Sequence, residues 1–191
     1  MTLFRTLGAL ALLGSAGAGL NGCIQAPDYA VEPDIDFAQL NVTRVPRVGG
    51  QNAIDTLQFV INFRDGDGDL GLNLEDISKA PYNSTTGGHN NLGYGNNYFI
   101  QPYKKNVATG VFEKFVINGN VGQYDGRYPR LDGTDAKPAP LKGVLRYKLP
   151  LRINGAPFFP GDVFRFEISI MDRGLHESNT VTSSEVTLGV I

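Results

Sequence analysis

The residues most suited to chemistry are three aspartates at alternate positions, Asp65, Asp67 and Asp69, with a glycine between each pair. Glycine lets the backbone curl, so these carboxylates can converge on one point. Calcium takes six to eight oxygen ligands at about 2.3–2.6 Å, and such a loop supplies the first of them. The match to the EF-hand pattern is partial, because Gly71 stands one position late and Asp76 replaces the final glutamate. The spacing therefore predicts a cation-binding loop outside the EF-hand fold.

A second acidic segment begins at Asp172, in the turn between the last two predicted strands. If the strands alternate in direction, the second and the sixth run the same way, and the loops that follow them emerge at one end of the fold. Side chains two residues apart along a strand share a face. Asp65 lies two residues after Phe63, and Asp172 lies two after Ile170, so both carboxylates are expected to point into the end of the core. The loop over residues 118–142 is expected at the same end.

Carboxylates held there need a counter-charge, because an unpaired buried charge costs several kcal/mol. One interpretation is a calcium site that draws on both segments, and its predicted ligands are Asp65, Asp67, Asp69, Asp172 and Asn179. A second is a bidentate ion pair with an arginine, for which the candidates are Arg127, Arg130 and Arg173. A third is that the Asp-Gly pairs form tight turns whose acids face water. The sequence leaves all three open.

The elements that must position these acids are short strands punctuated by turns. Alternating or β-type runs predict strands over residues 35–42, 55–64, 98–105, 112–117, 143–152, 163–171 and 180–188. About seven strands with little helical periodicity indicate an all-β fold, an antiparallel two-sheet sandwich. A short helix is predicted over 74–79, and Pro150 favours an edge position or the end of its strand.

Composition and motifs exclude several classes of protein. The 17 basic and 19 acidic side chains give a net charge of −2, which argues against a nucleic-acid partner. The single cysteine excludes an intrachain disulfide framework and a cysteine-based zinc cluster. Neither histidine, His89 or His176, stands in a zinc-hydrolase spacing, and the chain has no GxSxG elbow and no phosphate-binding loop. We therefore expect a protein that is not an enzyme.

The first residues have the composition of an export signal. Arg5 precedes a short apolar run over residues 7–20 that is too short for a membrane span. The run ends in Leu20-Asn21-Gly22-Cys23, which resembles a bacterial lipobox. That resemblance implies cleavage before Cys23 and an N-terminal lipid on its thiol, and hence attachment to a membrane. The expected organisation is a signal peptide over 1–22, a lipidated tether over 23–34 and one β-sandwich domain over 35–191.

Aromatic residues in the long polar loop offer a different interpretation. Tyr94 and Tyr98 follow a glycine-rich stretch, and exposed tyrosines can stack on sugar rings. They are the predicted ligand-binding residues of a glycan-binding accessory lipoprotein, which would work with an outer-membrane uptake system.

Several stretches together are similar to a group of small lipoproteins from Bacteroidota. They include FRDGDGDLGL (63–72), YDGRYPRL (124–131) and IMDRGLHESNTVTSSEV (170–186). The resemblance implies an outer-membrane location on either leaflet, and an immunoglobulin/fibronectin-III-like sandwich. The resemblance implies no particular biochemical activity. The expected function is therefore binding or scaffolding of an unidentified envelope protein or glycan.

Overall fold

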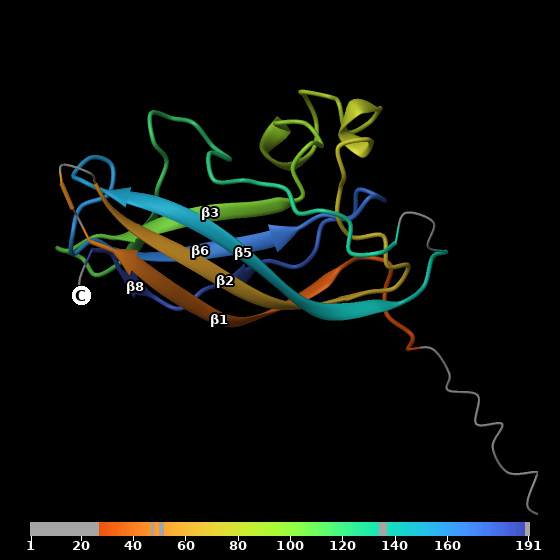
Figure 1. Cartoon of the computed structure of the whole chain (residues 1–191), viewed down its shortest axis with the longest axis horizontal. Helices are drawn as coiled ribbons and strands as arrows, with labels where there is room; N and C mark the ends of the chain where they lie inside the picture. Colours follow the sequence, from red (N-terminus) through yellow and green to blue (C-terminus); the bar gives the residue numbers. More distant parts are fainter. Residues whose placement is uncertain (1–26, 47, 50–51, 134–136, 190–191) are drawn as a thin grey trace, which may run out of the picture.

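The computed structural model describes residues 27–46, 48–49, 52–133 and 137–189, which form two antiparallel sheets packed face to face (Figure 1). One sheet has the strand order β1-β2-β5, and the other has the order β4-β3-β6-β7, with β8 also paired to β6. The strands are β1 (Asp34–Val45), β2 (Ala53–Asp65), β3 (Tyr98–Lys105), β4 (Phe112–Lys114), β5 (Leu141–Ile153), β6 (Val163–Ile170), β7 (Val181–Thr182) and β8 (Val186–Thr187). The predicted immunoglobulin-like β-sandwich is confirmed.

Strand β2 lies at the centre of the first sheet and shows why the alternation in the sequence was informative. Leu57, Phe59, Ile61 and Phe63 point inward and are buried, while Asn62 and Arg64 on the other face are exposed. The strand pairs along its length with β1 and with β5. Pro150 lies in β5, which is an edge strand of this sheet. Proline is tolerated in edge strands because they have a neighbouring strand on one side only.

Strand β6 plays the same part in the second sheet. Phe164, Phe166, Ile168 and Ile170 are all buried against the first sheet. The rings of Phe59 and Phe166 meet edge to face across the interface, with centroids 5.1 Å apart. An edge-to-face pair of this kind is worth about 0.5–1.5 kcal/mol beyond the area it buries.

Three predicted elements differ from the structure. The strand expected over 180–188 is divided into β7 and β8. At the break the Ser183 N–H still donates to the Phe166 carbonyl, but the Phe166 N–H donates to the Ser183 hydroxyl and not to a backbone carbonyl. The strand expected over 112–117 ends at Lys114. The helix expected over 74–79 is a single 3-10 turn, η1 (Asp76–Ser78), and a second turn, η2 (His89–Asn91), follows in the polar loop.

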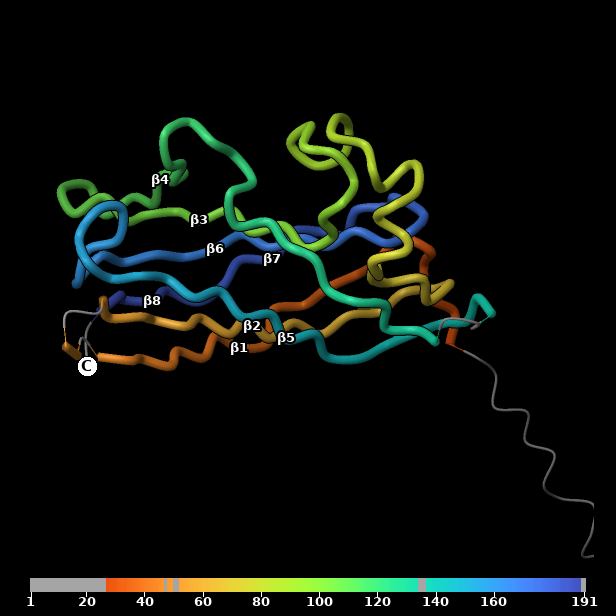
Figure 2. The backbone as a smooth tube through the Cα atoms, turned by 45° about the horizontal axis from the view of Figure 1, so that its top comes forward, coloured from red at the N-terminus to blue at the C-terminus, as the bar shows by residue number. Residues whose placement is uncertain are grey.

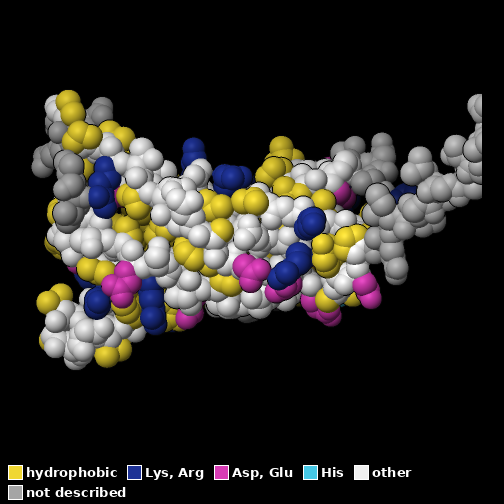
Figure 3. Space-filling view, turned by 90° about the horizontal axis from the view of Figure 1, so that it is seen from below, with side chains coloured by type: hydrophobic (Ala, Val, Ile, Leu, Met, Phe, Trp, Pro, Cys, Tyr) yellow, Lys and Arg dark blue, Asp and Glu magenta, His cyan; other side chains and the backbone are white. Residues whose placement is uncertain are grey.

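Acidic and basic side chains are interspersed on the face of the molecule drawn in Figure 3. Among the described residues, no helix is long and apolar enough to cross a bilayer.

Candidate functional site

The loops that follow β2 and β6 meet at one end of the sandwich, as the strand directions predicted. Both reach the right-hand end in Figures 1 and 2, beside the first described residues of the chain. Leu70 and Asp172 form an isolated antiparallel bridge, and the Arg173 N–H donates to the Asp69 carbonyl at 3.3 Å. Two segments about a hundred residues apart in the sequence are thereby joined by their backbones.

This junction gathers four carboxylates into one group. Asp65, Asp67, Asp69 and Asp172 each present an oxygen, and these oxygens lie within 4.8 Å of one another. Asp65 is 0% exposed and Asp172 is 1% exposed, while Asp67 and Asp69 are half-buried. We call these four residues the acid cluster. Asp65 and Asp172 are buried, so these two acids do not face water as the turn interpretation required.

Asp65 is the least satisfied member of the acid cluster. Both of its carboxylate oxygens, and Oδ1 of Asp67, are buried without a hydrogen-bond partner among the described residues. Burial and repulsion from Asp67, Asp69 and Asp172 raise the pKa of Asp65 to about 7. The hydroxyl of Tyr128 is also buried without a partner among the described residues. Its pKa is raised by burial and also by the charges of Asp65, Asp172 and Asp69, so it lies near the acid cluster. Buried polar atoms almost always have a partner, so these oxygens point to a group that binds between them.

Asp172 and Asp69 are held more firmly. The backbone N–H of His176 donates to Asp172 Oδ1 at 2.7 Å, and its ring Nδ1 lies 2.9 Å from Oδ2. Burial raises the pKa of Asp172 despite these bonds, and the carboxylate in turn raises the pKa of His176. Burial and the charge of Asp172 raise the pKa of Asp69, although Arg173 opposes the shift. Asp172 is therefore held by His176, and Asp69 by Arg173.

The arginines expected as alternative partners bind other groups. Arg130 forms a bidentate pair with Asp76, with Nε 2.8 Å from Oδ2. Arg173 forms a bidentate pair with Asp132, at 3.0 and 2.6 Å. Arg127 bonds the carbonyl of Gly95. Among the described ion pairs, none joins an arginine side chain to the acid cluster, so the structure does not contain the predicted bidentate pair there. Arg173 contacts Asp69 through its backbone N–H, which lies 3.3 Å from Oδ1.

The backbone of the acidic loop is packed too closely to accept larger residues. A Cβ added to Gly66 would lie 2.5 Å from the carbonyl oxygen of Tyr29 and 2.6 Å from that of Ala30. Gly68 has a φ of +71°, a left-handed conformation that favours glycine. The glycines therefore let the loop fold against the described start of the chain.

Asn179 does not take the role that the sequence predicted for it. Its amide oxygen accepts from the Ile35 N–H at 2.8 Å, and its amide nitrogen donates to the Ile35 carbonyl at 2.8 Å. Both polar groups are thus used to attach the turn after β6 to strand β1. The structure gives Asn179 a structural role outside the acid cluster.

The tyrosine interpretation also requires a correction. Tyr98 is 0% exposed and stacks on Tyr147, with ring centroids 4.3 Å apart, so it cannot meet a sugar. Tyr98 is the first residue of β3, and its side chain is on the face of that strand that points into the core. Tyr94 is half-buried, and its ring lies against Gly87 and Gly88.

A polar network near the loop of η2 was not found from the sequence. Glu177 Oε1 accepts from the Ser169 hydroxyl at 2.7 Å and lies 3.0 Å from His89 Nδ1. In a nucleophilic triad the imidazole lies between the hydroxyl and the carboxylate, whereas here the carboxylate lies between the other two. No spacing pattern links residues 89, 169 and 177, so only the fold could show this contact.

Cys23 lies outside the described residues. Comparison of the chain with known family models, with curated protein sequences and with solved structures found no match.

Proposed function

We propose that this chain is a lipid-anchored β-sandwich protein of the cell envelope, with a binding or scaffolding role and no catalytic one. In this proposal the acid cluster holds a calcium ion that stabilises one end of the sandwich. The observation that carries the calcium proposal is the pair of Asp65 oxygens, which are buried without a described partner inside a group of four acids.

The spacing of the acid cluster suits calcium. Ligands on opposite sides of one calcium ion are about 4.6–5.2 Å apart, twice the usual calcium–oxygen distance. The four oxygens lie within 4.8 Å of one another and can therefore share one ion. Magnesium usually binds one or two carboxylates and keeps several waters, so four converging carboxylates favour calcium.

The ion would supply charge neutralisation. Asp65, Asp67 and Asp69 follow β2 and Asp172 follows β6, so a cation bound by all four joins the two sheets at this end. Arg173 supports the same junction, because its guanidinium bonds the carbonyls of Leu70 and Gly71. The role assigned to the ion is therefore structural.

Calcium binding is tested by titration calorimetry and thermal unfolding of protein that has first been treated with EDTA. We expect heat on addition of calcium, and stabilisation by about 2.7 kcal/mol at a hundred times the Kd. Asp67→Asn and Asp172→Asn should weaken binding strongly. Asp28→Asn makes the same chemical change at an exposed carboxylate and should have no effect. Absence of both heat and stabilisation would remove calcium from the proposal.

The anchor is supported by the lipobox-like sequence that ends at Cys23. A lipid contributes about 0.8 kcal/mol of membrane affinity per buried CH2 group, so two or three chains hold a protein durably. Cys23→Ala should move the protein from the membrane fraction to the soluble fraction. If the variant remains with the membranes, the lipid is not what attaches it. Fractionation after selective outer-membrane extraction tests the location.

A further inference from the structure

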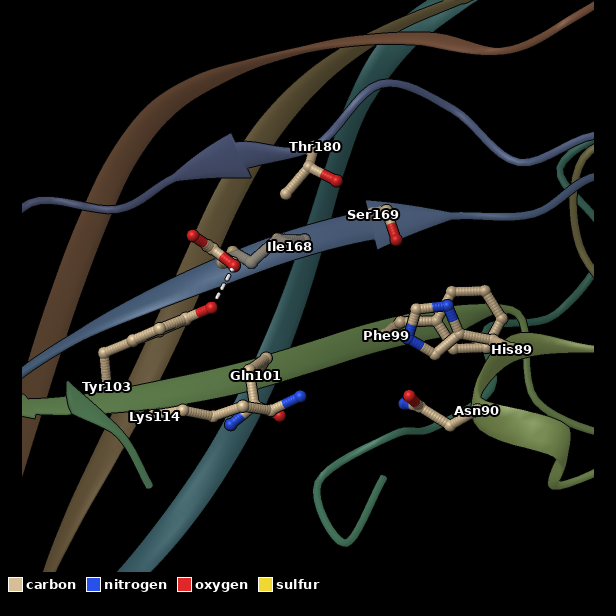
Figure 4. A pocket seen from close by; sticks show the side chains of 10 residues that line it. His89, Asn90, Phe99, Gln101, Tyr103, Lys114, Ile168, Ser169 and Thr180 are labelled. Atoms are coloured by element: carbon tan, nitrogen blue, oxygen red, sulfur yellow. Dashed lines mark hydrogen bonds between the residues drawn. The ribbon is translucent and has the colours of Figure 1, made fainter. Parts of the chain in front are cut away.

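A polar cavity of about 150 Å³ lies on the outer face of the second sheet, away from the acid cluster. Its floor is formed by outward-facing side chains of β3 and β6, which alternate with the buried ones. The turn η2 forms one wall with His89 and Asn90, and β4 contributes Lys114 from the other side (Figure 4).

The polar groups of the floor are fixed in place before any ligand arrives. The Tyr103 hydroxyl donates to Glu167 Oε2 at 2.7 Å, which orients the carboxylate. The Gln101 amide nitrogen donates to the carbonyls of Pro102 and Phe115, at 2.8 and 3.1 Å, which fixes the direction of its amide oxygen. Side chains held in this way lose little freedom on binding, so they favour recognition.

The wall is fixed as well. The ring of His89 stacks on Phe99 with centroids 4.1 Å apart and planes 13° apart, as Figure 4 shows. Its Nδ1 lies 3.0 Å from Glu177, which also accepts a bond from Ser169 at the cavity edge. The network that joins residues 89, 169 and 177 therefore positions an aromatic ring beside the polar floor.

The chemistry of the lining selects the ligand. Among the described lining residues, one ammonium group (Lys114) is balanced by one carboxylate (Glu167), so a phosphate would meet a repelling acid. The Asn90 amide offers donors and an acceptor, the Gln101 amide oxygen offers an acceptor, and the aromatic rings offer apolar surface. A hydroxyl group both donates and accepts, so several hydroxyls on one small ring match this lining. The cavity is below the 300–1,000 Å³ typical of drug-sized ligands and has room for one such ring.

We propose that this cavity binds an uncharged sugar ring, such as the end unit of a glycan. The site does not include Tyr94 or Tyr98, and none of its lining residues belongs to the acid cluster.

The probes are the methyl glycosides of glucose, galactose, mannose and N-acetylglucosamine, with inorganic phosphate as the charged comparison. Binding to the full chain is measured by saturation-transfer NMR and titration, once in EDTA and once in calcium. We expect at least one glycoside to bind with a Kd below about 10 mM, the weak end of specific recognition. Glu167→Gln and Lys114→Ala should each raise that Kd about tenfold or more, and both keep the fold because Lys114 is exposed and glutamine preserves the acceptor for Tyr103.

The matched control is Lys148→Ala, which removes an exposed lysine from β5 in the other sheet and should leave the Kd unchanged. Three results would overturn the proposal. They are no binding by any of the four glycosides, tighter binding of phosphate than of every glycoside, or glycoside binding that survives both cavity substitutions. Glycoside binding that is the same in EDTA and in calcium supports the site whatever the outcome for the acid cluster.

Discussion

Replacement of Asp65 by asparagine should stabilise the calcium-free protein at high pH and not at low pH. The pKa of Asp65 is raised from 3.8 to about 7, so the folded protein keeps a proton that the unfolded chain has already released. Between about pH 3.8 and pH 7, the free energy of unfolding therefore falls as the pH rises. The full displacement corresponds to about 4 kcal/mol. Asparagine has nearly the same shape and does not ionise, so Asp65→Asn removes this loss.

The assay is urea or thermal unfolding of the wild type and the variant in EDTA, at about pH 5 and pH 8.5. At each pH, the stability of the wild type is subtracted from that of the variant. The cost of burying the asparagine amide is the same at both values of pH, so it cancels when these two differences are compared. By pH 5 the unfolded chain has already released this proton, so only the interval from pH 5 to about pH 7 contributes, and we expect the variant to gain about 2.7 kcal/mol relative to the wild type between the two conditions. That gain corresponds to a relative increase in Tm of about 5–11 °C for a chain of this size.

Calcium should reverse the direction of this pH dependence. The ion requires ionised carboxylates, so wild-type stability in calcium should increase with pH, whereas Asp65→Asn should lose most of its response to the ion. Asp28→Asn should behave as the wild type throughout. The reasoning about the acid cluster is refuted if Asp65→Asn gains no more at pH 8.5 than at pH 5 in EDTA. Such a result means that Asp65 ionises without cost.

Two further substitutions test how this end of the fold is held together. Arg173→Ala leaves the half-buried Asp132 without its bidentate partner and should cost about 2–3 kcal/mol of stability in urea unfolding. The control, Arg64→Ala, removes an exposed ion pair and should cost at most about 1 kcal/mol. Equal losses of stability in the two variants would contradict the reasoning from burial. Tyr98→Phe removes a buried hydroxyl that has no described partner. The free energy of unfolding, measured by thermal unfolding, should therefore stay within about 0.5 kcal/mol of the wild type or increase. A decrease of more than about 1 kcal/mol would mean that the hydroxyl is hydrogen-bonded.

The sequence predicted the sandwich because its core strands are strongly periodic. In β2, Ile61 and Phe63 alternate with the exposed Asn62 and Arg64, and a shift of one residue would expose the whole apolar set. The same alternation placed Asp65 and Asp172 on the inward face, which led to the prediction that they meet. Short elements were harder, because a two-residue strand such as β7 carries no period and depends on its neighbour for its hydrogen bonds.

The errors at the candidate sites have a common physical origin. Asn179 and Tyr98 were assigned from residue type and loop position, but each is used by a partner distant in the sequence, namely Ile35 and Tyr147. The choice between calcium and arginine likewise depended on which acid each arginine would meet. Arg130 binds Asp76 across 54 residues, and no local spacing encodes that pairing.

The acid cluster and the described start of the chain share one end of the sandwich, and this bears on how an anchored domain would be held. Gly66 lies against the carbonyls of Tyr29 and Ala30, so the acidic loop contacts the segment that leads back to Cys23. Pro27 is four residues from that cysteine, a distance that the chain can extend to about 14 Å at most. In a lipid-anchored protein the calcium end would therefore face the membrane. If the acid cluster holds calcium, the ion is bound by Asp65 and Asp67, which lie on either side of Gly66 in the sequence. It would then stabilise the loop that contacts Tyr29 and Ala30, and through them the proposed tether.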